Sequence, residues 1–497
     1  MLTKQDFTQT IQTQKVVSLY KQVVMDTETA LATLLKFSDH SHFVFFESIS
    51  ANIKHDRFSY FGFDPHVKII CLADKIILAY ASGKTQTITE NLYDFLNTLC
   101  KDYQVPHNKD EKFYCGLMGY MSYECMSFLE DIPLSKKRDL NMPFAEFILP
   151  RNMIIIDNLF NTVSIVRNVF QDPSVSNLDD YYDSEVSKLN TVITTLLNPP
   201  TKSYPPIDTQ LSQDIDPSTY DCNFNKEEFI RKTKQCKEYI KKGDIFQIQV
   251  SRRVKTKLHE DPSTLYRQLR NHNPSPFLFY LRFEESHLMG ASPEILVGVS
   301  DNKMTIRPLA GTRKRFSSHR TEQEIEDELL SDEKERAEHI MLVDLARNDI
   351  GRACEIGSVH VNELMSIEKY RHVIHMASEV EGTLKPNCTA IDALKYGFPA
   401  GTVSGTPKIR AMEIISELES IQREFYSGGV IFIDFQNNLK SSLIIRSMYA
   451  KNGHVYTQAA AGIVADSIPE LEYKETENKM RACLKVMTKK SSDKGSN

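Results

Sequence analysis

The chain has 497 residues, of which 41% are hydrophobic and 25% charged, a composition typical of a soluble globular protein large enough for two domains. Its formal net charge of −6 argues against nucleic-acid or anionic-membrane partners, and no apolar run approaches the ~18 residues that cross a bilayer. Nine cysteines without a Cys-x-x-Cys pair, and a start without the apolar core of a signal peptide, predict reduced thiols in a cytoplasmic protein.

Residues 41–170 are predicted to be mostly β-strands, because their apolar runs are rich in Ile, Val and Phe. The expected strands include 42–48, 66–73 and 148–157, and the expected helices of this part are 91–100 and 177–197. Five prolines among Ser, Thr and Asp then follow between 198 and 219, which is the composition of a linker. We therefore place the main domain boundary there.

The second part opens with a strong helix signal. Asn225 is a candidate N-cap, Glu228 completes a capping box, and Gly243 ends the helix. Later segments alternate less regularly than in a β-α-β protein. The expected strands are 245–254, 277–283, 294–306 as a hairpin, 428–435, 442–450 and 455–464, and the expected helices are 331–349 and 469–487. Runs of strands and runs of helices favour an α+β fold with antiparallel β-sheets packed together and flanked by helices.

Two of these helices each carry a pair of glutamates three residues apart. Glu335 and Glu338 share one helix face, and so do Glu472 and Glu475. If the two faces meet, four carboxylates surround one point, and all-oxygen ligands suit a hard divalent ion such as Mg²⁺. The alternative is a solvated charged face for the first pair and simple helix-dipole stabilisation for the second.

A glycine-containing loop at 398–408 leads into another predicted helix. Thr406 is a candidate N-cap and Pro407 fits the first helical position, so the free amides at this helix start are suited to an anion. The spacing matches neither a P-loop nor a dinucleotide fingerprint, and a plain turn and cap is the alternative. Arg446, within the apolar strand 442–450, calls for a carboxylate partner, either from a ligand or from a structural salt bridge.

Taken together, seven segments make the chain similar to the component I (large subunit) family of anthranilate synthase, whose members use chorismate. The resemblance extends over about 40–485 and rests on GDIFQIQVSRR (243–253), NPSPFLFYL (273–281), ASPEILV (291–297), RPLAGTRKR (307–315), AEHIMLVDLARND (337–349), FPAGTVSGTPK (398–408) and PELEYKETENK (469–479). It implies a four-layer α/β/β/α chorismate-binding fold. It also implies an N-terminal regulatory region at 15–197, a linker at 198–222, a catalytic domain at 223–487 and a disordered tail at 488–497.

The resemblance implies an Mg²⁺-dependent lyase that converts chorismate and ammonia into anthranilate and pyruvate through aminodeoxyisochorismate, the first committed step of tryptophan biosynthesis. Glu338 and Glu475 correspond to direct magnesium ligands, and Glu335 and Glu472 to their supporting partners. Glu294 corresponds to the general acid for the departing 4-hydroxyl. The remaining catalytic positions are Gln247, where water-adding relatives carry lysine, His375, tied to pyruvate elimination, and Thr402.

Further positions correspond to the chorismate site and to a feedback site for tryptophan. Tyr426 and Arg446 resemble a clamp on the enolpyruvyl carboxylate, and the other chorismate-binding positions are Gly311, Thr312, Ala460, Ala461 and Gly462. The inhibitor positions are Glu47, Ser48, Asn273, Pro274, Pro276, Phe277 and Leu278. The sequence departs from the family at Ile431 and Phe432, at Leu278 and at Ala460, where a glycine is usual and a positive φ would strain alanine.

The chain shows no glutaminase signature with a nucleophilic cysteine, so ammonia is expected from a separate glutamine amidotransferase subunit, in a heterotetramer of two large and two small subunits. Two rival functions remain. Component I of aminodeoxychorismate synthase is disfavoured by Ala310-Gly311-Thr312 and Ala400-Gly401-Thr402, where that relative typically has Lys-Gly-Thr and Gly-Gly-Ser. A non-catalytic tryptophan sensor of the same fold is disfavoured because all four glutamates and Glu294 are present.

Overall fold

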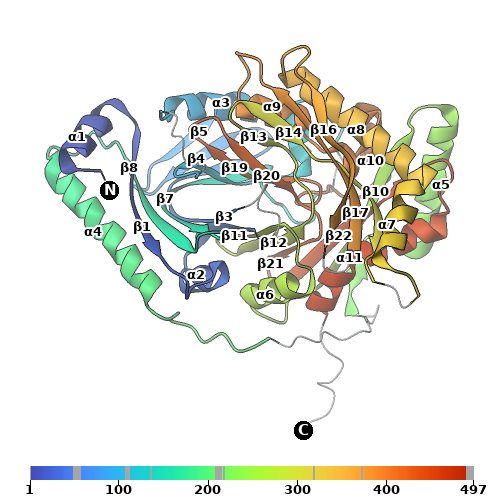
Figure 1. Cartoon of the computed structure of the whole chain (residues 1–497), viewed down its shortest axis with the longest axis horizontal. Coiled ribbons are helices and arrows are strands. Elements are labelled where there is room, and N and C mark those ends of the chain that lie inside the picture. The colour runs from blue at the N-terminus through green and yellow to red at the C-terminus, as the bar shows by residue number, and fades with distance from the viewer. Residues whose placement is uncertain are drawn as a thin grey trace, which may run out of the picture.

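The structure is a computed structural model that describes residues 2–48, 57–106, 112–134, 137–207, 215, 219–316, 319–370 and 373–488. Antiparallel strands form a large curled sheet, and helices cover it on its outer sides (Figure 1). The predicted α+β class with antiparallel strands is confirmed. Within the described ranges, no helix is both long enough and apolar enough to cross a membrane. The predicted tail at 488–497 lies outside the described residues except for Thr488.

The first part of the chain contains α1 (Lys4–Thr13), β1 (Val16–Val24), α2 (Ala30–Lys36), β2 (His42–Ser48), β3 (Phe58–Cys71), β4 (Ile76–Tyr80), β5 (Thr85–Ile88), α3 (Leu92–Asp102), β6 (Gly116–Met121), the 3-10 helix η1 (Tyr123–Phe128), β7 (Ala145–Asp157), β8 (Thr162–Phe170) and α4 (Leu178–Leu197).

The second part contains β9 (Asp221–Cys222), α5 (Lys226–Lys242), β10 (Gln247–Lys257), α6 (Pro262–His272), β11 (Phe277–Phe283), β12 (Ser286–Ser292), β13 (Gly298–Ser300), β14 (Lys303–Ile306), β15 (Leu309–Lys314), α7 (Glu322–Ser331), α8 (Glu333–Ala353), β16 (His360–Lys369) and β17 (Val373–Thr383). It ends with α9 (Ala390–Gly397), η3 (Gly401–Val403), β18 (Gly405–Thr406), α10 (Lys408–Leu418), β19 (Gly429–Asp434), β20 (Leu439–Leu443), β21 (Ser447–Lys451), β22 (His454–Ile463) and α11 (Pro469–Met487).

Strands from the two parts of the chain hydrogen-bond to each other. β2 pairs with β11, so that Glu47 lies opposite Leu278, and β6 pairs with β19. The N-terminal and C-terminal parts therefore share one continuous β network rather than meeting only through side chains. The linker at 198–222 stays a prediction. The two parts are joined by backbone hydrogen bonds between their strands.

The core between the two parts is rich in Phe and Tyr, in a chain without tryptophan. Phe432 packs against Phe46, Tyr60 and Phe113, with ring centroids 6.4, 5.2 and 5.0 Å away. Phe432 is thus accommodated in a buried aromatic cluster, in which each ring pair contributes about 0.5–1.5 kcal/mol beyond its buried area. Ile431 is buried in a separate apolar core.

The predicted helix ends are confirmed where they depend on neighbouring residues in the sequence. The capping box between Asn225 and Glu228 is present, and Gly243 ends α5 with φ +82°. Thr406, in contrast, does not cap α10: it pairs with Gln247 of β10, and Pro407 stands at the N-cap. That prediction was wrong because a strand pairing distant in sequence holds the Thr406 backbone.

The predicted strand 442–450 is also wrong as a single element. β20 ends at Leu443, β21 begins at Ser447, and Arg446 between them has a φ of +51°. A left-handed conformation is unfavourable for a non-glycine residue and is held only by its surroundings. Arg446 therefore lies outside both strands and does not follow the alternation of side chains along a strand.

Candidate active site

A buried acid lies at the centre of the candidate site. Glu294, at the turn after β12, is 7% exposed, and Thr402 Oγ1 of η3 donates a 2.6 Å hydrogen bond to its Oε1. Burial raises the pKa of Glu294 to about 7, although the Thr402 hydrogen bond and the positive charge of Lys479 oppose the rise. A carboxylic acid with this pKa keeps a proton to donate near neutral pH.

A neutral histidine belongs to the same site. His375 of β17 lies with Nδ1 3.0 Å from Thr312 Oγ1 and 3.3 Å from the Gly311 carbonyl oxygen of β15. A carbonyl oxygen only accepts, so Nδ1 carries the hydrogen and Nε2 keeps its lone pair. Burial, followed by the charge of Arg446, lowers the pKa of His375 to about 4, so the ring is an uncharged base at neutral pH.

Arg446 retains donors for an anion. Its Nη1 donates to the Lys479 carbonyl oxygen at 2.8 Å, and within the described residues no carboxylate lies within 4 Å of its guanidinium in an ion pair. Burial lowers the pKa of Arg446. The structural salt bridge considered from the sequence is therefore not formed, and the guanidinium is suited to a carboxylate supplied by a ligand.

The backbone at the end of β22 is fixed by side chains from two other elements. The Ala460 N–H donates to Tyr426 Oη at 2.8 Å, and Lys479 Nζ donates to the Ala460 carbonyl at 3.0 Å. Ala460 does not have a positive φ, so alanine is tolerated where the family usually has glycine. Only its backbone groups are used.

The neighbouring positions on β10 and β22 leave little free space. Gln247 is 7% exposed, and a Cβ added at Gly462 would lie 3.1 Å from Gln247 Nε2. Ala461 is fully buried opposite Val250. The neutral amide of Gln247 therefore lies against Gly462 of β22.

The glutamate pairs come from helices whose charges interact. The negative charge of Glu475 on α11 contributes to raising the pKa of Glu338 on α8, although burial is the larger cause. Burial raises the pKa of Glu472 to about 7, and the charge of Glu475 adds to it. The two helices therefore bring their carboxylates close enough to repel one another.

Cationic side chains partly offset this repulsion. Glu335 accepts from Arg313 at 2.8 Å, and a Cβ at Gly311, whose φ is +65°, would lie 3.2 Å from Glu335 Oε2. Glu475 is paired with Lys479 at 2.6 Å. Burial acts to raise the pKa of Glu475, but the charge and the hydrogen bond of Lys479 act in the opposite direction. The net result is a lowered pKa for Glu475.

The donor set fits a divalent cation in chemistry but is not drawn together into a ligand cluster. Among the residues that the structure describes, no three His, Cys, Asp or Glu side chains are grouped so that they could hold a metal ion. Burial nevertheless raises the pKa values of Glu338 and Glu472, and a hard cation bound beside them would stabilise their ionised form.

A pocket of about 650 Å³ lies where the two parts of the chain meet, and most of the predicted inhibitor positions line it: Glu47, Ser48, Pro276, Phe277 and Leu278. Asn273 and Pro274 are not among its lining residues. Asn273 ends α6, and its side chain donates to the Ala291 carbonyl at 3.4 Å.

The carboxylate of Glu47 already has strong partners, although neither of them lines this pocket. Arg270 of α6 donates to both oxygens at 2.7 Å each, and Tyr266 Oη donates at 3.0 Å. Arg270 was not singled out from the sequence, and neither was Lys479. Lys479 lies within the motif 469–479, one turn after Glu475, so helical spacing was the signal that could have identified it.

Comparisons with known proteins identify the family of the chain. Residues 43–485 match the chorismate binding enzyme family. The chain is 37% identical to anthranilate synthase component 1 of Aquifex aeolicus, covering 95% of this chain and 94% of that one, and 36% identical to the Acetivibrio thermocellus protein of the same name, covering 95% of each.

Among solved structures, anthranilate synthase component I of Streptococcus pneumoniae superimposes with a TM-score of 0.77 at 30% identity, covering 93% of this chain and 99% of that one. The menaquinone-specific isochorismate synthase of Escherichia coli, at 16% identity and a TM-score of 0.70 over 95% of both chains, shares the fold. The chain is thus a chorismate-binding enzyme. Within that class it belongs to the anthranilate synthase component 1 family.

Proposed function

We propose that this chain is the large subunit of an anthranilate synthase, a lyase that forms anthranilate and pyruvate from chorismate and ammonia. The observation that carries the proposal is the buried Glu294, held by Thr402 and with its pKa raised to about 7. Such a group donates a proton to the departing 4-hydroxyl of chorismate, which water alone does poorly at neutral pH.

The other residues divide the remaining work. Gln247 is uncharged, which suits a nucleophile such as ammonia that needs no base to activate it. His375, with Nε2 unprotonated, accepts the proton removed when pyruvate leaves and the ring becomes aromatic. Arg446, with Tyr426 nearby, holds the enolpyruvyl carboxylate, and Gly311, Thr312 and the β22 residues Ala460, Ala461 and Gly462 line the ring.

Magnesium is the proposed cofactor. Glu338 and Glu475 would hold it, Glu335 and Glu472 would support it, and the ion would neutralise the ring carboxylate of chorismate and polarise the ring. Support comes from the raised pKa values of Glu338 and Glu472: burial is the largest cause at both, and the charge of Glu475 adds to the rise at each. Lys479 would then release Glu475 and keep its contact with the Ala460 carbonyl oxygen.

We further propose regulation and assembly of the kind found in this family. The pocket lined by Glu47, Ser48 and the 276–278 segment would take tryptophan as feedback inhibitor. A glutamine amidotransferase subunit would supply ammonia, with two large and two small subunits in the complex, in the cytoplasm. The name component 1 of the relatives supports a second component.

The test is anthranilate fluorescence from chorismate, Mg²⁺ and an ammonium salt, without any partner. Steady formation of anthranilate and pyruvate in equal amounts is expected. Accumulation of 4-amino-4-deoxychorismate would instead assign the chain to the folate branch. Tryptophan binding without chorismate binding, measured by calorimetry, would make it a sensor.

A further inference from the structure

A buried arginine that the proposed chemistry does not use lies close to the candidate site. Arg423, between α10 and β19, is 1% exposed, and each of its side-chain nitrogens donates a hydrogen bond. Glu419, at the end of α10, accepts from Nε at 2.9 Å and from Nη2 at 2.7 Å. Burial acts to lower the pKa of Arg423, but the charge and hydrogen bonds of Glu419 act in the opposite direction, and the net result is a raised pKa. The guanidinium is therefore a charged group held in one fixed plane.

The other bonds of Arg423 go to two elements that carry site residues. Nη1 donates to the Val403 carbonyl oxygen of η3 at 2.7 Å, and Nη2 donates to the Gln249 carbonyl oxygen of β10 at 2.6 Å. Val403 directly follows Thr402, whose hydroxyl holds the buried acid. Gln249 lies two residues after Gln247, so their side chains lie on the same face of the strand. One guanidinium therefore joins the segment that holds the acid to the strand that carries Gln247.

The same two elements are joined by further buried hydrogen bonds. The Gln249 N–H donates to the Ser404 carbonyl oxygen, just after η3, at 2.9 Å. Ser251 of β10 donates from its N–H and from its hydroxyl to Glu419 Oε1, at 2.8 Å each. Glu419 thus holds β10 directly and also through Arg423. A buried polar network of this kind is rigid when all its members are paired, and it is costly to break.

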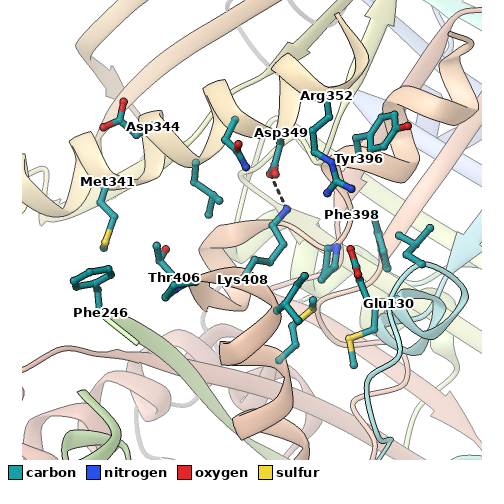
Figure 2. A pocket seen from close by; sticks show the side chains of 18 of the residues that line it. Glu130, Phe246, Met341, Asp344, Asp349, Arg352, Tyr396, Phe398, Thr406 and Lys408 are labelled. Atoms are coloured by element: carbon teal, nitrogen blue, oxygen red, sulfur yellow. Dashed lines mark hydrogen bonds and ion pairs between the residues drawn. The ribbon is translucent and has the colours of Figure 1, made fainter. Parts of the chain in front are cut away.

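The chain around η3 is also in contact with α8. Leu345 of α8 packs so tightly on Gly401 that an added Cβ there would lie 1.9 Å from Leu345 Cδ2. Further along, Lys408 forms a 2.7 Å ion pair with Asp349 of α8, at the wall of a pocket of about 720 Å³ (Figure 2). Contacts from α8 and from β10 therefore both act on this segment, and Arg423 is the charged group that connects it to β10.

We propose that Arg423 is a positioning residue of the reaction: it fixes η3 relative to β10 and so keeps the Thr402 hydroxyl on Glu294. Its bonds go to protein groups, so it acts through Thr402 rather than on the substrate. The inference rests on the proposed function, because it takes Glu294 as the proton donor. A catalytic group displaced by about 1 Å can lose about 100-fold in rate, and a planar cation bonded to three separate elements restricts such a displacement.

The experiment uses Arg423→Lys, which keeps the positive charge but cannot reproduce the planar set of donors. The ammonium-dependent kcat is expected to fall by about 10–100-fold. The alkaline limb of the pH–rate profile is expected to move upward by up to about one unit, because a displaced Thr402 hydroxyl no longer stabilises the ionised form of Glu294. Lys479, whose charge also acts on Glu294, is retained in every variant.

A double variant separates positioning from a general loss of structure. In Arg423→Lys/Thr402→Val the limb is expected to stay where Thr402→Val alone places it, because the hydrogen bond is already absent. Arg167→Lys is the matched control, since Arg167 is 5% exposed and its Nε donates to Glu185 at 2.6 Å, in the first part of the chain. This control should lower the urea midpoint and leave both kcat and the limb unchanged.

An unmoved limb in Arg423→Lys would overturn the proposal, and so would a further shift in the double variant or an equal loss of kcat in Arg167→Lys. Glu419→Gln, which removes the counter-charge at nearly constant volume, repeats the test if Arg423→Lys does not fold. The same upward shift is expected there, and its absence would again overturn the proposal. Failure of the unmodified chain to form anthranilate from ammonium would instead reject the proposed function, so the two failures are distinguishable.

Discussion

Two regions are assigned from the family resemblance: the candidate active site and the pocket between the two parts of the chain. Their acidic side chains lie in opposite electrostatic environments. Burial raises the carboxyl pKa values of Glu294, Glu338 and Glu472, and the charge of Glu475 adds to the rise at Glu338 and Glu472, so the environment of these acids disfavours their charge. In the pocket between the two parts of the chain, Glu47 is instead neutralised by a two-pronged contact with Arg270 and by Tyr266.

The difference separates a reactive site from a structural junction. Unfavourable charge placement is retained where a proton or a cation completes the chemistry, and it clusters at functional sites. A saturated ion pair holds two elements together, here β2 of the first part and α6 of the second. Four substitutions test this contrast, from the largest expected effect to the smallest.

Replacing Glu294 removes the proposed proton donor. Glu294→Gln is expected to lower kcat by about 10²–10⁴-fold, the usual contribution of a general acid. Only the protonated form of Glu294 can donate, and its pKa is raised to about 7. Activity of the unmodified enzyme should therefore fall as pH rises through about 7. The measurement is the ammonium-dependent pH–rate profile, with Glu285→Gln in an exposed turn as control. A variant that retains its rate would remove Glu294 from the chemistry.

Replacing Glu338 tests the proposed magnesium site. Glu338→Gln is expected to weaken magnesium binding in the presence of chorismate by at least about 100-fold, since removal of a direct ligand costs more than the 10–100-fold of a supporting residue. Calorimetric titration measures this without turnover. Glu333→Gln, on the exposed side of the same helix, should bind magnesium normally. Equal affinities for the two variants would contradict the assignment.

Breaking the Glu47–Arg270 pair should affect folding rather than chemistry. Arg270→Ala leaves the buried Glu47 carboxylate without its guanidinium and is expected to lower the free energy of unfolding by about 3 kcal/mol. Urea denaturation measures the loss, and ammonium-dependent kcat should remain unchanged. Arg270→Lys, which keeps the charge but not the two-pronged geometry, should fall between. A large loss of kcat with normal stability would erase the distinction between the two regions.

The smallest effect is expected from the hydroxyl beside the acid. Thr402 stabilises the ionised form of Glu294, so Thr402→Val should raise the Glu294 pKa further and move the alkaline limb of the pH profile upward by about one unit. Thr402→Ser should keep the limb in place. A downward shift would mean that the hydroxyl stabilises the protonated acid instead.

Predictions from local pattern and from packing fared differently. The α5 capping box, the Gly243 terminus and the α11 span 469–487 follow from residues a few positions apart, and these predictions are confirmed. Two local predictions were wrong: Thr406 does not cap α10 because it pairs with β10, and the strand 442–450 is not continuous because Arg446 has a left-handed backbone between β20 and β21.

The sequence by itself determined the class of fold, the family and the chemical types of the site: acids three residues apart, a neutral Gln247, a histidine and an arginine. It determined them because spacing and motif are properties of the chain. Only the tertiary structure decided that the charge of Glu475 on α11 acts on Glu338 of α8. It also decided that Glu294 is buried beside Thr402 and that Glu47 forms an ion pair with Arg270. These depend on burial and on pairs up to hundreds of residues apart, which no local pattern records.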